Sequence, residues 1–239
     1  MNENVINELK SIDENKRLQN IEKALKKGVF IPCTHGVIIG DEAELSAGSL
    51  VLEGSIIIGN SSVGEGSVIG PNTLLYNMKV GKNTHLNAFQ GYDAEVMDGC
   101  NIGPFVHVRP NSVIRNSVHL GNFVEVKNSD IGEHTSVSHL TYVGDSDVGQ
   151  HVNFGCGCVT VNFNGKTKHR TKVGNHCFIG CNTNLVAPVT IGDYGYTAAG
   201  STITDDVPDN ALAIARARQV NKPNWVLKKK PYRGMEYDI

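Results

Sequence analysis

The sequence repeats an aliphatic residue at every sixth position over most of its length. These positions, all aliphatic except Thr197, are Ile39, Leu45, Val51, Ile57, Val63, Ile69 and Leu75, then Val80 and Leu86 after a slip of one residue, then Val96, Ile102, Val108, Ile114, Leu120 and Val126, and finally Val173, Ile179, Leu185, Ile191, Thr197 and Ile203. A repeat of this length is too short to fold alone. It must form one side of a coil that stacks on neighbouring coils.

The period of six matches neither a helix, which repeats its apolar face at about 3.6 residues, nor a flat strand, which repeats at about 2. It fits a short strand followed by a corner, with the aliphatic residue pointing inward and Gly, Asn, Asp or Ser at the bend. Three such sides close a triangular coil whose backbone groups bond to the coils above and below. The sequence therefore predicts an all-β solenoid, a parallel β-helix.

Composition agrees with this fold and excludes several classes of partner. The 239 residues include 26 glycines and 6% aromatic residues, as expected where corners need glycine and a narrow core excludes rings. The net charge of −2 gives no overall attraction to nucleic acid or to an anionic membrane. No apolar run has the length of a membrane span, and the first residues lack the features of a signal peptide. We therefore expect a cytoplasmic protein that binds neither nucleic acid nor a membrane.

The cysteines indicate neither a zinc site nor a disulfide framework. The six cysteines form no CxxC pair. In Cys156-Gly157-Cys158 both thiols are expected on the same side of one strand, which is the wrong spacing for a zinc knuckle. We interpret the cysteines as reduced, packed side chains.

The chain divides into three segments. Residues 1–30 predict a helical cap that ends at Gly28, covers the open first coil and contains a break near residues 13–15. Its two apolar stripes are Val5, Leu9 and Ile12, and Leu18, Ile21 and Leu25. Residues 31–204 form the coils, with a basic loop excursion at 161–172, where functional residues are expected. Residues 205–239 form a basic, extended tail.

Several strings resemble the C-terminal acetyltransferase domain of the bifunctional bacterial enzyme that acetylates glucosamine-1-phosphate and then uridylylates the product. They are Gly103-Pro-Phe-Val-His-Val-Arg109-Pro, Gly121-Asn-Phe-Val-Glu-Val-Lys127-Asn, His139-Leu-Thr-Tyr142-Val-Gly-Asp145, Asn162-Phe-Asn-Gly-Lys-Thr-Lys168, Leu185-Val-Ala-Pro-Val-Thr-Ile-Gly192 and Ala198-Ala199-Gly200. The resemblance implies a left-handed β-helix of hexapeptide repeats with a short N-terminal helical segment, assembled as a homotrimer. It also implies an acyltransferase that uses acetyl-CoA to make N-acetylglucosamine-1-phosphate, on the route to UDP-N-acetylglucosamine and peptidoglycan. Nothing in the sequence resembles the family's nucleotidyltransferase part, so we expect no uridyltransferase activity and no bound metal.

The resemblance also assigns roles to individual residues. His139 is the catalytic base, since an imidazole titrates near neutrality. The substrate-binding residues are Arg109, Lys127, Tyr142, Asn153 and Lys168, whose cations suit a phosphomonoester. The coenzyme-binding residues are Cys156, Asn162, Phe163, Cys181, Ala199 and Arg216, with the Cys156 N–H as the donor to the oxyanion. The family usually has Ala at 156, Tyr at 163 and Ser at 181, so these three substitutions bear on coenzyme affinity.

Three alternatives remain open on the sequence alone. In the first alternative, the acceptor is another amino sugar or nucleotide sugar. In the second, the chain is a non-catalytic scaffold that has lost coenzyme binding. A third reading takes His134 and His139, with His119 or His151 of a neighbouring chain, as a zinc site like that of the γ-class carbonic anhydrases.

Overall fold

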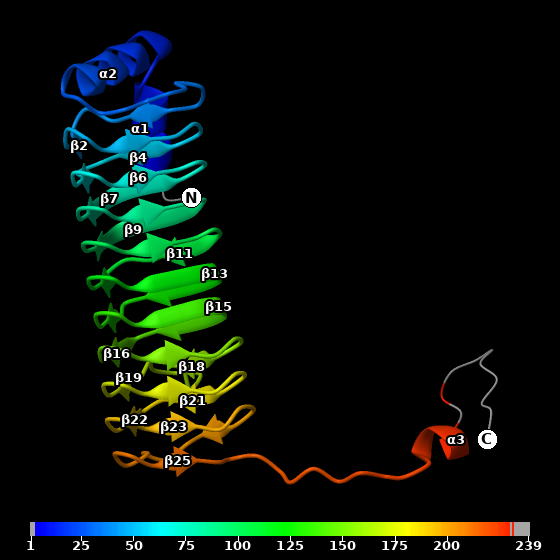
Figure 1. The fold of residues 1–239 in the computed structure, drawn as a ribbon. Coiled ribbons are helices and arrows are strands. Elements are labelled where there is room, and N and C mark those ends of the chain that lie inside the picture. Colours follow the sequence, from blue (N-terminus) through cyan, green and yellow to red (C-terminus); the bar gives the residue numbers. More distant parts are fainter. Residues whose placement is uncertain (1–2, 230, 232–239) are drawn as a thin grey trace.

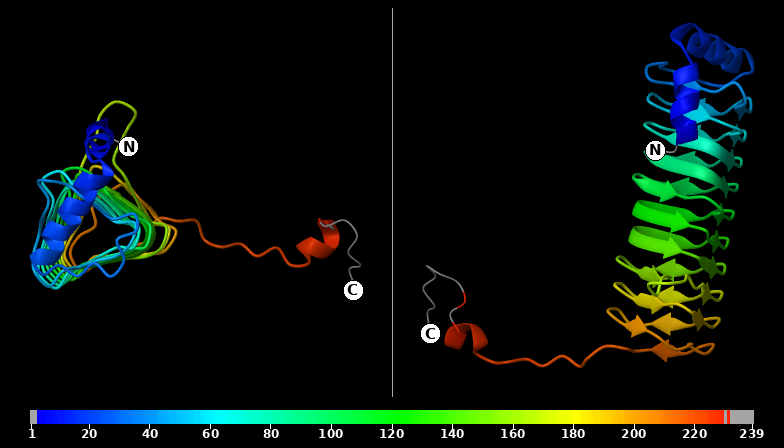
Figure 2. Two further views of the ribbon diagram at one scale, coloured as in Figure 1. Left: turned by 90° about the horizontal axis from the view of Figure 1, so that it is seen from above. Right: turned by 180° about the vertical axis from the view of Figure 1, so that it is seen from behind.

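The described part of the chain forms a tall three-sided solenoid of twenty-five strands, each paired in parallel with its neighbours (Figure 1). The structure, a computed structural model, describes residues 3–229 and 231. From above, the coils superpose as a triangle (Figure 2). The predicted left-handed parallel β-helix is confirmed. No helix within the described residues is long and apolar enough to cross a membrane.

We name the three faces A, B and C in the order in which the chain first reaches them. Face A contains β1 (Ile38–Ile39), β4 (Ile56–Ile58), β11 (Val106–Val108), β18 (Val159–Val161), β21 (Asn184–Val186) and β24 (Thr202–Ile203). Face B contains β2 (Glu44–Leu45), β5 (Ser62–Val63), β12 (Val113–Ile114), β14 (Asp130–Ile131), β16 (Ser146–Val148), β19 (Thr171–Val173) and β22 (Val189–Ile191). Face C contains β3 (Leu50–Val51), β6 (Val68–Ile69), β8 (His85–Leu86), β10 (Asn101–Ile102), β17 (Asn153–Phe154), β20 (Phe178–Ile179), β23 (Tyr196–Thr197) and β25 (Leu212–Ala213).

Four longer strands bend round a corner and belong to two faces. Strands β7 (Leu74–Val80) and β9 (Phe89–Val96) cross corner AB, where face A meets face B. Strands β13 (His119–Lys127) and β15 (Ser136–Gly144) cross corner CA. The third edge of the triangle is corner BC.

The register of the strands fixes the length of each coil. Ile38 lies opposite Ile56, and His119 lies opposite Ser136, so these coils have nearly the same length. Ser146 lies opposite Thr171, a longer interval, because the basic loop is inserted in this coil at corner AB. Residues at equivalent positions of successive coils therefore form columns, spaced by about 4.8 Å as in any sheet.

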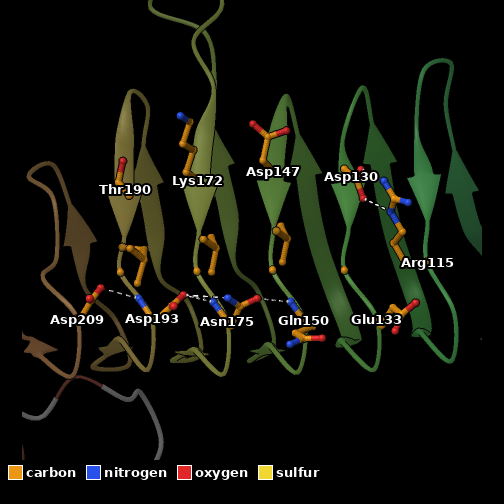
Figure 3. Close-up of a pocket in the computed structure, with 17 residues that line it drawn as sticks. Arg115, Asp130, Glu133, Asp147, Gln150, Lys172, Asn175, Thr190, Asp193 and Asp209 are labelled. Atoms are coloured by element: carbon orange, nitrogen blue, oxygen red, sulfur yellow. Dashed lines mark hydrogen bonds and ion pairs between the residues drawn. The ribbon is translucent and has the colours of Figure 1, made fainter.

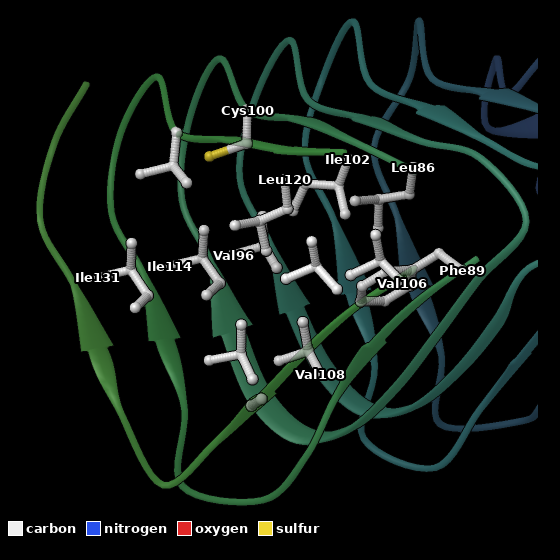
Figure 4. Close-up of a cluster of buried hydrophobic side chains, with 14 of the residues drawn as sticks. Leu86, Phe89, Val96, Cys100, Ile102, Val106, Val108, Ile114, Leu120 and Ile131 are labelled. Carbon is white, nitrogen blue, oxygen red and sulfur yellow. The ribbon is translucent and has the colours of Figure 1, made fainter. Parts of the chain in front are cut away.

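The repeated aliphatic residues fill the core as the sequence predicts (Figure 4). Ile57, Ile114 and Leu120 are 0% exposed, and one continuous cluster of buried side chains runs from the helical cap to the last coils. The expectation that the core excludes rings was wrong, because Phe89 is also 0% exposed. A Cβ at Gly91 would lie 2.5 Å from the Phe89 ring, so the ring occupies space that a side chain at 91 would take.

Two helices cover the N-terminal end of the solenoid. Helix α1 (Glu3–Ser11) packs Val5 outside face A against Ile58 and Leu74. Helix α2 (Glu14–Lys26) lies over the first coil (Figure 1) and begins at Asp13, whose carboxylate accepts from the Lys16 N–H at 2.8 Å. Gly28 follows the C-cap with a φ of 87°.

The second apolar stripe was predicted incorrectly. Ile21 is buried as expected, with Ala24 beside it in the main core cluster. Leu18 and Leu25 are nearly half exposed, because the face of α2 that meets the coil is the one that carries Ile21 and Ala24.

The interpretation of the cysteines as packed side chains holds for only half of them. Cys100, Cys158 and Cys177 are buried, but Cys33, Cys156 and Cys181 are exposed, and none forms a disulfide. Cys156 and Cys158 do not share one side of a strand. They flank Gly157 at corner CA, so that Cys156 points outward and Cys158 points into the core.

Beyond β25 the chain leaves the solenoid in an extended course to the short helix α3 (Trp225–Lys229) (Figure 1). The remainder of the predicted basic tail, from Lys230 onward apart from residue 231, lies outside the described residues.

We expect the stacked core to dominate stability. Ile114→Ala removes a fully buried side chain, so it should lower the free energy of unfolding by about 2–5 kcal/mol. The matched change Ile214→Ala, at a residue that is 62% exposed, should change it by less than about 0.5 kcal/mol. Denaturant unfolding of both variants measures the difference, and equal losses would contradict the assigned core.

Candidate functional site

A pocket of about 740 Å³ lies on face B, and none of the predicted site residues line it (Figure 3). The charged residues that line it are Arg115, Lys172, Asp130, Glu133, Asp147, Asp193 and Asp209. Arg115 is paired with Asp130 at 2.6 Å, so the remaining charge is mainly negative. An acidic trough of this kind repels phosphate groups and is a poor site for a phosphorylated substrate.

A second pocket, of about 530 Å³, lies at corner AB and has the opposite charge. Its cations come from three elements: Arg109 follows β11, Lys127 ends β13, and Lys168 and Arg170 belong to the inserted loop. Asp145 is the one carboxylate among its lining residues. We call this the cation pocket.

Asp145 lies beneath the cation pocket and binds the side chains around it. Its side chain is only 6% exposed and lies 3.5 Å from the Lys127 ammonium. Asn128 donates to the carboxylate at 2.5 Å, and Asn162 donates to its other oxygen. Burial raises the pKa of Asp145, but the bonds from Asn128 and Asn162 and the charge of Lys127 outweigh it and hold that pKa below its usual value.

The Asn162 amide connects this network to Tyr142. Asn162 Nδ2 lies 3.3 Å from the Tyr142 hydroxyl as well as near Asp145. The Tyr142 side chain runs along face A toward corner AB and passes over Gly144. A Cβ at position 144 would clash with the Tyr142 hydroxyl, so this course requires the glycine. The structure therefore joins Lys127, Tyr142 and Asn162 through contacts within one chain.

Two ammonium groups lie close together in the pocket. Lys127 lowers the pKa of Lys168 below its usual value through direct contact and charge repulsion. Arg109 donates to Glu125 at 2.8 Å, while Arg170 is held by Asp147 and by the backbone carbonyls of Asn128 and Ser146, both at 3.0 Å. Arg170 thus anchors the loop, and the close pair of lysines favours an anion between them.

The loop itself is a small hairpin that projects from the triangle (Figure 2). Phe163 and Lys168 form an antiparallel bridge around the Asn164-Gly165 turn. The Asn164 side chain accepts from the Lys166 and Thr167 N–H groups, both at 2.9 Å. Phe163 is 54% exposed and points away from the core.

Other predicted residues form a column at corner CA, one coil apart. The register of the flanking strands sets His139 level with Cys156, Cys156 level with Cys181, and Cys181 level with Ala199. Arg216 joins them from the tail, since a Cβ at Gly200 would lie 3.8 Å from Arg216 Cδ.

His139 and Cys156 both present groups that are available to a ligand. His139 is exposed, and its ring forms no hydrogen bond with any residue that the structure describes. The Cys156 N–H likewise donates to no group among residues 3–229 and 231.

The cation pocket and the column of residues at corner CA are separated along one strand. His139 lies near corner CA and Gly144 near corner AB on the same strand β15, which is about 16 Å of extended chain. Tyr142 lies between them. Asn153 begins β17 on face C and is exposed, so it belongs to neither set in this chain.

Two residues of the cation pocket were not assigned a role from the sequence. Asp145 ends the string that contains His139 and Tyr142, and Asn128 directly follows Lys127. Their positions beside assigned residues were a usable signal, but their burial and mutual hydrogen bond were not visible in the sequence.

The histidines of the proposed zinc site lie on different corners. His134 is at corner BC, where its ring stacks on His151 at 4.8 Å, His151 on His176 at 4.9 Å and His176 on Tyr194 at 4.9 Å. His139 lies across face C at corner CA. Among the described residues, no three His, Cys, Asp or Glu side chains of one chain are grouped to hold a metal ion.

Comparison with known proteins identifies relatives of this chain. A family model described as "Bacterial transferase hexapeptide (six repeats)" matches residues 170–205. "Bifunctional protein GlmU" of Caldicellulosiruptor saccharolyticus is 46% identical over 223 residues, which are 93% of this chain and 48% of that protein. The protein of the same name from Geobacillus sp. (strain WCH70) is 48% identical over 204 residues, or 85% of this chain and 44% of that protein.

Among solved structures, the UDP-N-acetylglucosamine acyltransferase of Francisella novicida is similar, with 16% identity, a TM-score of 0.43, and coverage of 78% of this chain and 67% of that chain. The chain spans about half the length of the curated relatives that it matches. It is therefore a hexapeptide-repeat protein homologous to the part of the GlmU proteins that it covers, in agreement with the resemblance seen in its sequence.

Proposed function

We propose that this chain is an N-acetyltransferase that moves the acetyl group of acetyl-CoA to the amine of glucosamine-1-phosphate. The observation that carries the proposal is the cation pocket, which Lys127, Lys168 and Arg109 line together. A phosphomonoester dianion between these groups relieves their repulsion and accepts several charge-assisted hydrogen bonds. The homology to GlmU proteins supports this choice of reaction.

The chemistry requires a base and an oxyanion donor near the amine. In the proposal, the His139 imidazole takes the proton as the amine attacks the thioester carbonyl, and CoA leaves as the thiol. The Cys156 N–H, one coil below, donates to the oxyanion. The backbone donor does not depend on the side chain at 156, so the family's usual alanine and this cysteine serve equally. No metal takes part.

Tyr142 and Asn162 lie on the path between the two sets of residues. The sugar phosphate would rest on face A with its phosphate in the cation pocket. Its amine is on the ring carbon next to the one that carries the phosphate, so it cannot span the two corners of one chain, and the base would be His139 of a neighbouring subunit. Asn153 would act from the corresponding face of a neighbouring subunit. The coenzyme would extend from Cys156 past Cys181 and Ala199, with Arg216 holding its phosphates, and Phe163 would contact it from the loop.

The proposed assembly is a homotrimer. Phe105, Phe123 and Leu140 form an apolar ridge at corner CA, each about 60% exposed, and the two phenylalanine rings stack at 5.4 Å. A ridge of this kind beside His139 favours coverage by a second copy of the chain. The product would then be uridylylated in the cytoplasm, on the route to UDP-N-acetylglucosamine.

The test of the reaction is CoA thiol release with a panel of acceptors. We expect turnover with glucosamine-1-phosphate and little with glucosamine-6-phosphate or UDP-linked amino sugars. Turnover with another acceptor alone would favour the alternative amino-sugar transferase. No turnover, together with no thermal shift on adding CoA, would indicate a scaffold without coenzyme binding.

His139→Ala should lower kcat by about a hundredfold or more, because the attacking amine loses its base. The matched control is His134→Ala, at corner BC, which should retain wild-type turnover. Sedimentation should give the same trimer for both variants and for the wild type. Wild-type turnover in His139→Ala would remove this residue from the mechanism, and a monomeric wild type would remove the trimer.

Lys127→Met should raise KM for glucosamine-1-phosphate by roughly 10- to 100-fold, which corresponds to the loss of about 1.5–3 kcal/mol from one charged hydrogen bond. The control Lys172→Met changes an exposed lysine of the acidic trough and should leave KM unchanged. With glucosamine, which has no phosphate, the Lys127 variant and the wild type should react alike. An equal loss with both acceptors would show that Lys127 does not bind the phosphate.

A further inference from the structure

Two exposed thiols lie next to each other in the column at corner CA. Cys156 and Cys181 are both exposed and both are reduced. The pairing of β17 with β20, before the two cysteines, and of β18 with β21, after them, has the same residue offset. Cys156 and Cys181 therefore occupy equivalent positions on adjacent coils. The Asn182 N–H also donates to the Cys156 carbonyl at 2.8 Å, which holds the two turns together.

The geometry of this pair fits a disulfide. Adjacent coils bring level Cα atoms to about 4.8 Å, within the range of about 4.4–6.8 Å that disulfides span. A Cβ at Gly155 would lie 2.8 Å from Cys181 Sγ, so the Cys181 sulfur rests against the residue that precedes Cys156. Both side chains would have to rotate to bring the sulfurs to bonding distance.

The other cysteines cannot take part in the same way. Burial raises the pKa of Cys100 and of Cys158 to about 11, and it raises the pKa of Cys177 too, which keeps these thiols protonated and shielded. Cys33 is exposed, but it lies between Phe30, which pairs with Leu50 of the first coils, and β1, so it is several coils away from Cys156, which follows β17.

We propose that Cys156 and Cys181 form a dithiol site that hydrogen peroxide oxidises reversibly to a disulfide. One thiolate attacks peroxide and becomes a sulfenic acid, with release of hydroxide. The second thiol then attacks that sulfur, forms the S–S bond and releases water. The two electrons pass to peroxide, and a dithiol reductant restores both thiols by exchange.

The disulfide has a consequence that rests on the proposed function. Both cysteines lie in the proposed coenzyme path, on the coils that follow His139. Joining their sulfurs moves both side chains and occupies the space in which the thioester would lie. Oxidation should therefore abolish CoA binding, and reduction should restore it.

The test treats the reduced full chain with a small excess of hydrogen peroxide, alkylates the remaining thiols and analyses the digest by mass spectrometry. We expect peptides that contain Cys156 and Cys181 to be linked, and two fewer thiols to be alkylated in the denatured protein. Cys33→Ser, the matched exposed control, should form the same link, while Cys156→Ser and Cys181→Ser should each lose it. A non-reducing gel should show one chain, not covalent dimers.

Full alkylation of all six cysteines after treatment, links to other cysteines or links between chains would each overturn the proposal. A second arm follows the thermal shift with CoA in reduced, oxidised and re-reduced protein, where we expect the shift to be present, absent and present. A disulfide that leaves the CoA shift intact would overturn the coenzyme consequence alone. If the reduced protein does not bind CoA, the proposed function fails, while the mass measurement still decides the thiol pair.

Discussion

The stacking of one coil on the next is the constraint on which the rest of the structure depends. Each inward aliphatic residue packs on the equivalent residue of the neighbouring coil, and backbone hydrogen bonds keep the coils in register. The same register lines up the outward residues in columns. Corner BC therefore carries stacked rings, and corner CA carries His139, Cys156, Cys181 and Ala199. Outward side chains on this surface therefore lie in steps of about 4.8 Å.

The cation pocket arises where that regularity is interrupted. The coil from Ser146 to Thr171 is longer than the coils before it, and the extra residues leave the solenoid at corner AB. They bring Lys168 beside Lys127, a residue of the regular coil, and Arg170 fixes the base of the loop through Asp147 and Asn128. Asp145 is the buried counterion beneath the pocket, so the lysines keep their positions while the charge above them remains positive.

The sequence was most informative about the repeating parts of the solenoid. The period of six predicted the three faces, the buried aliphatic residues and the insertion at 161–172, because each follows from local pattern. It failed where a contact depends on a distant residue. The burial of Phe89 depends on the missing side chain of Gly91, the exposure of Leu18 and Leu25 depends on how α2 meets the first coil, and the exposure of Cys156 depends on a turn at Gly157. The family strings suggested the candidate site residues, but only the register shows that they fall into two sets.

The separation of those sets bears on how one substrate could engage both. His139 and the cation pocket lie at opposite ends of the face A part of β15, and Tyr142 lies between them. In glucosamine-1-phosphate the phosphate and the amine are on adjacent ring carbons, so the proposed substrate would meet the cation pocket of one subunit and His139 of another. At corner CA the proposed base, His139, and the proposed oxyanion donor, the Cys156 N–H, are one coil apart, so the attacking amine and the thioester carbonyl would lie between them. The stacking distance that builds the core would then also set the spacing between the base and the oxyanion donor.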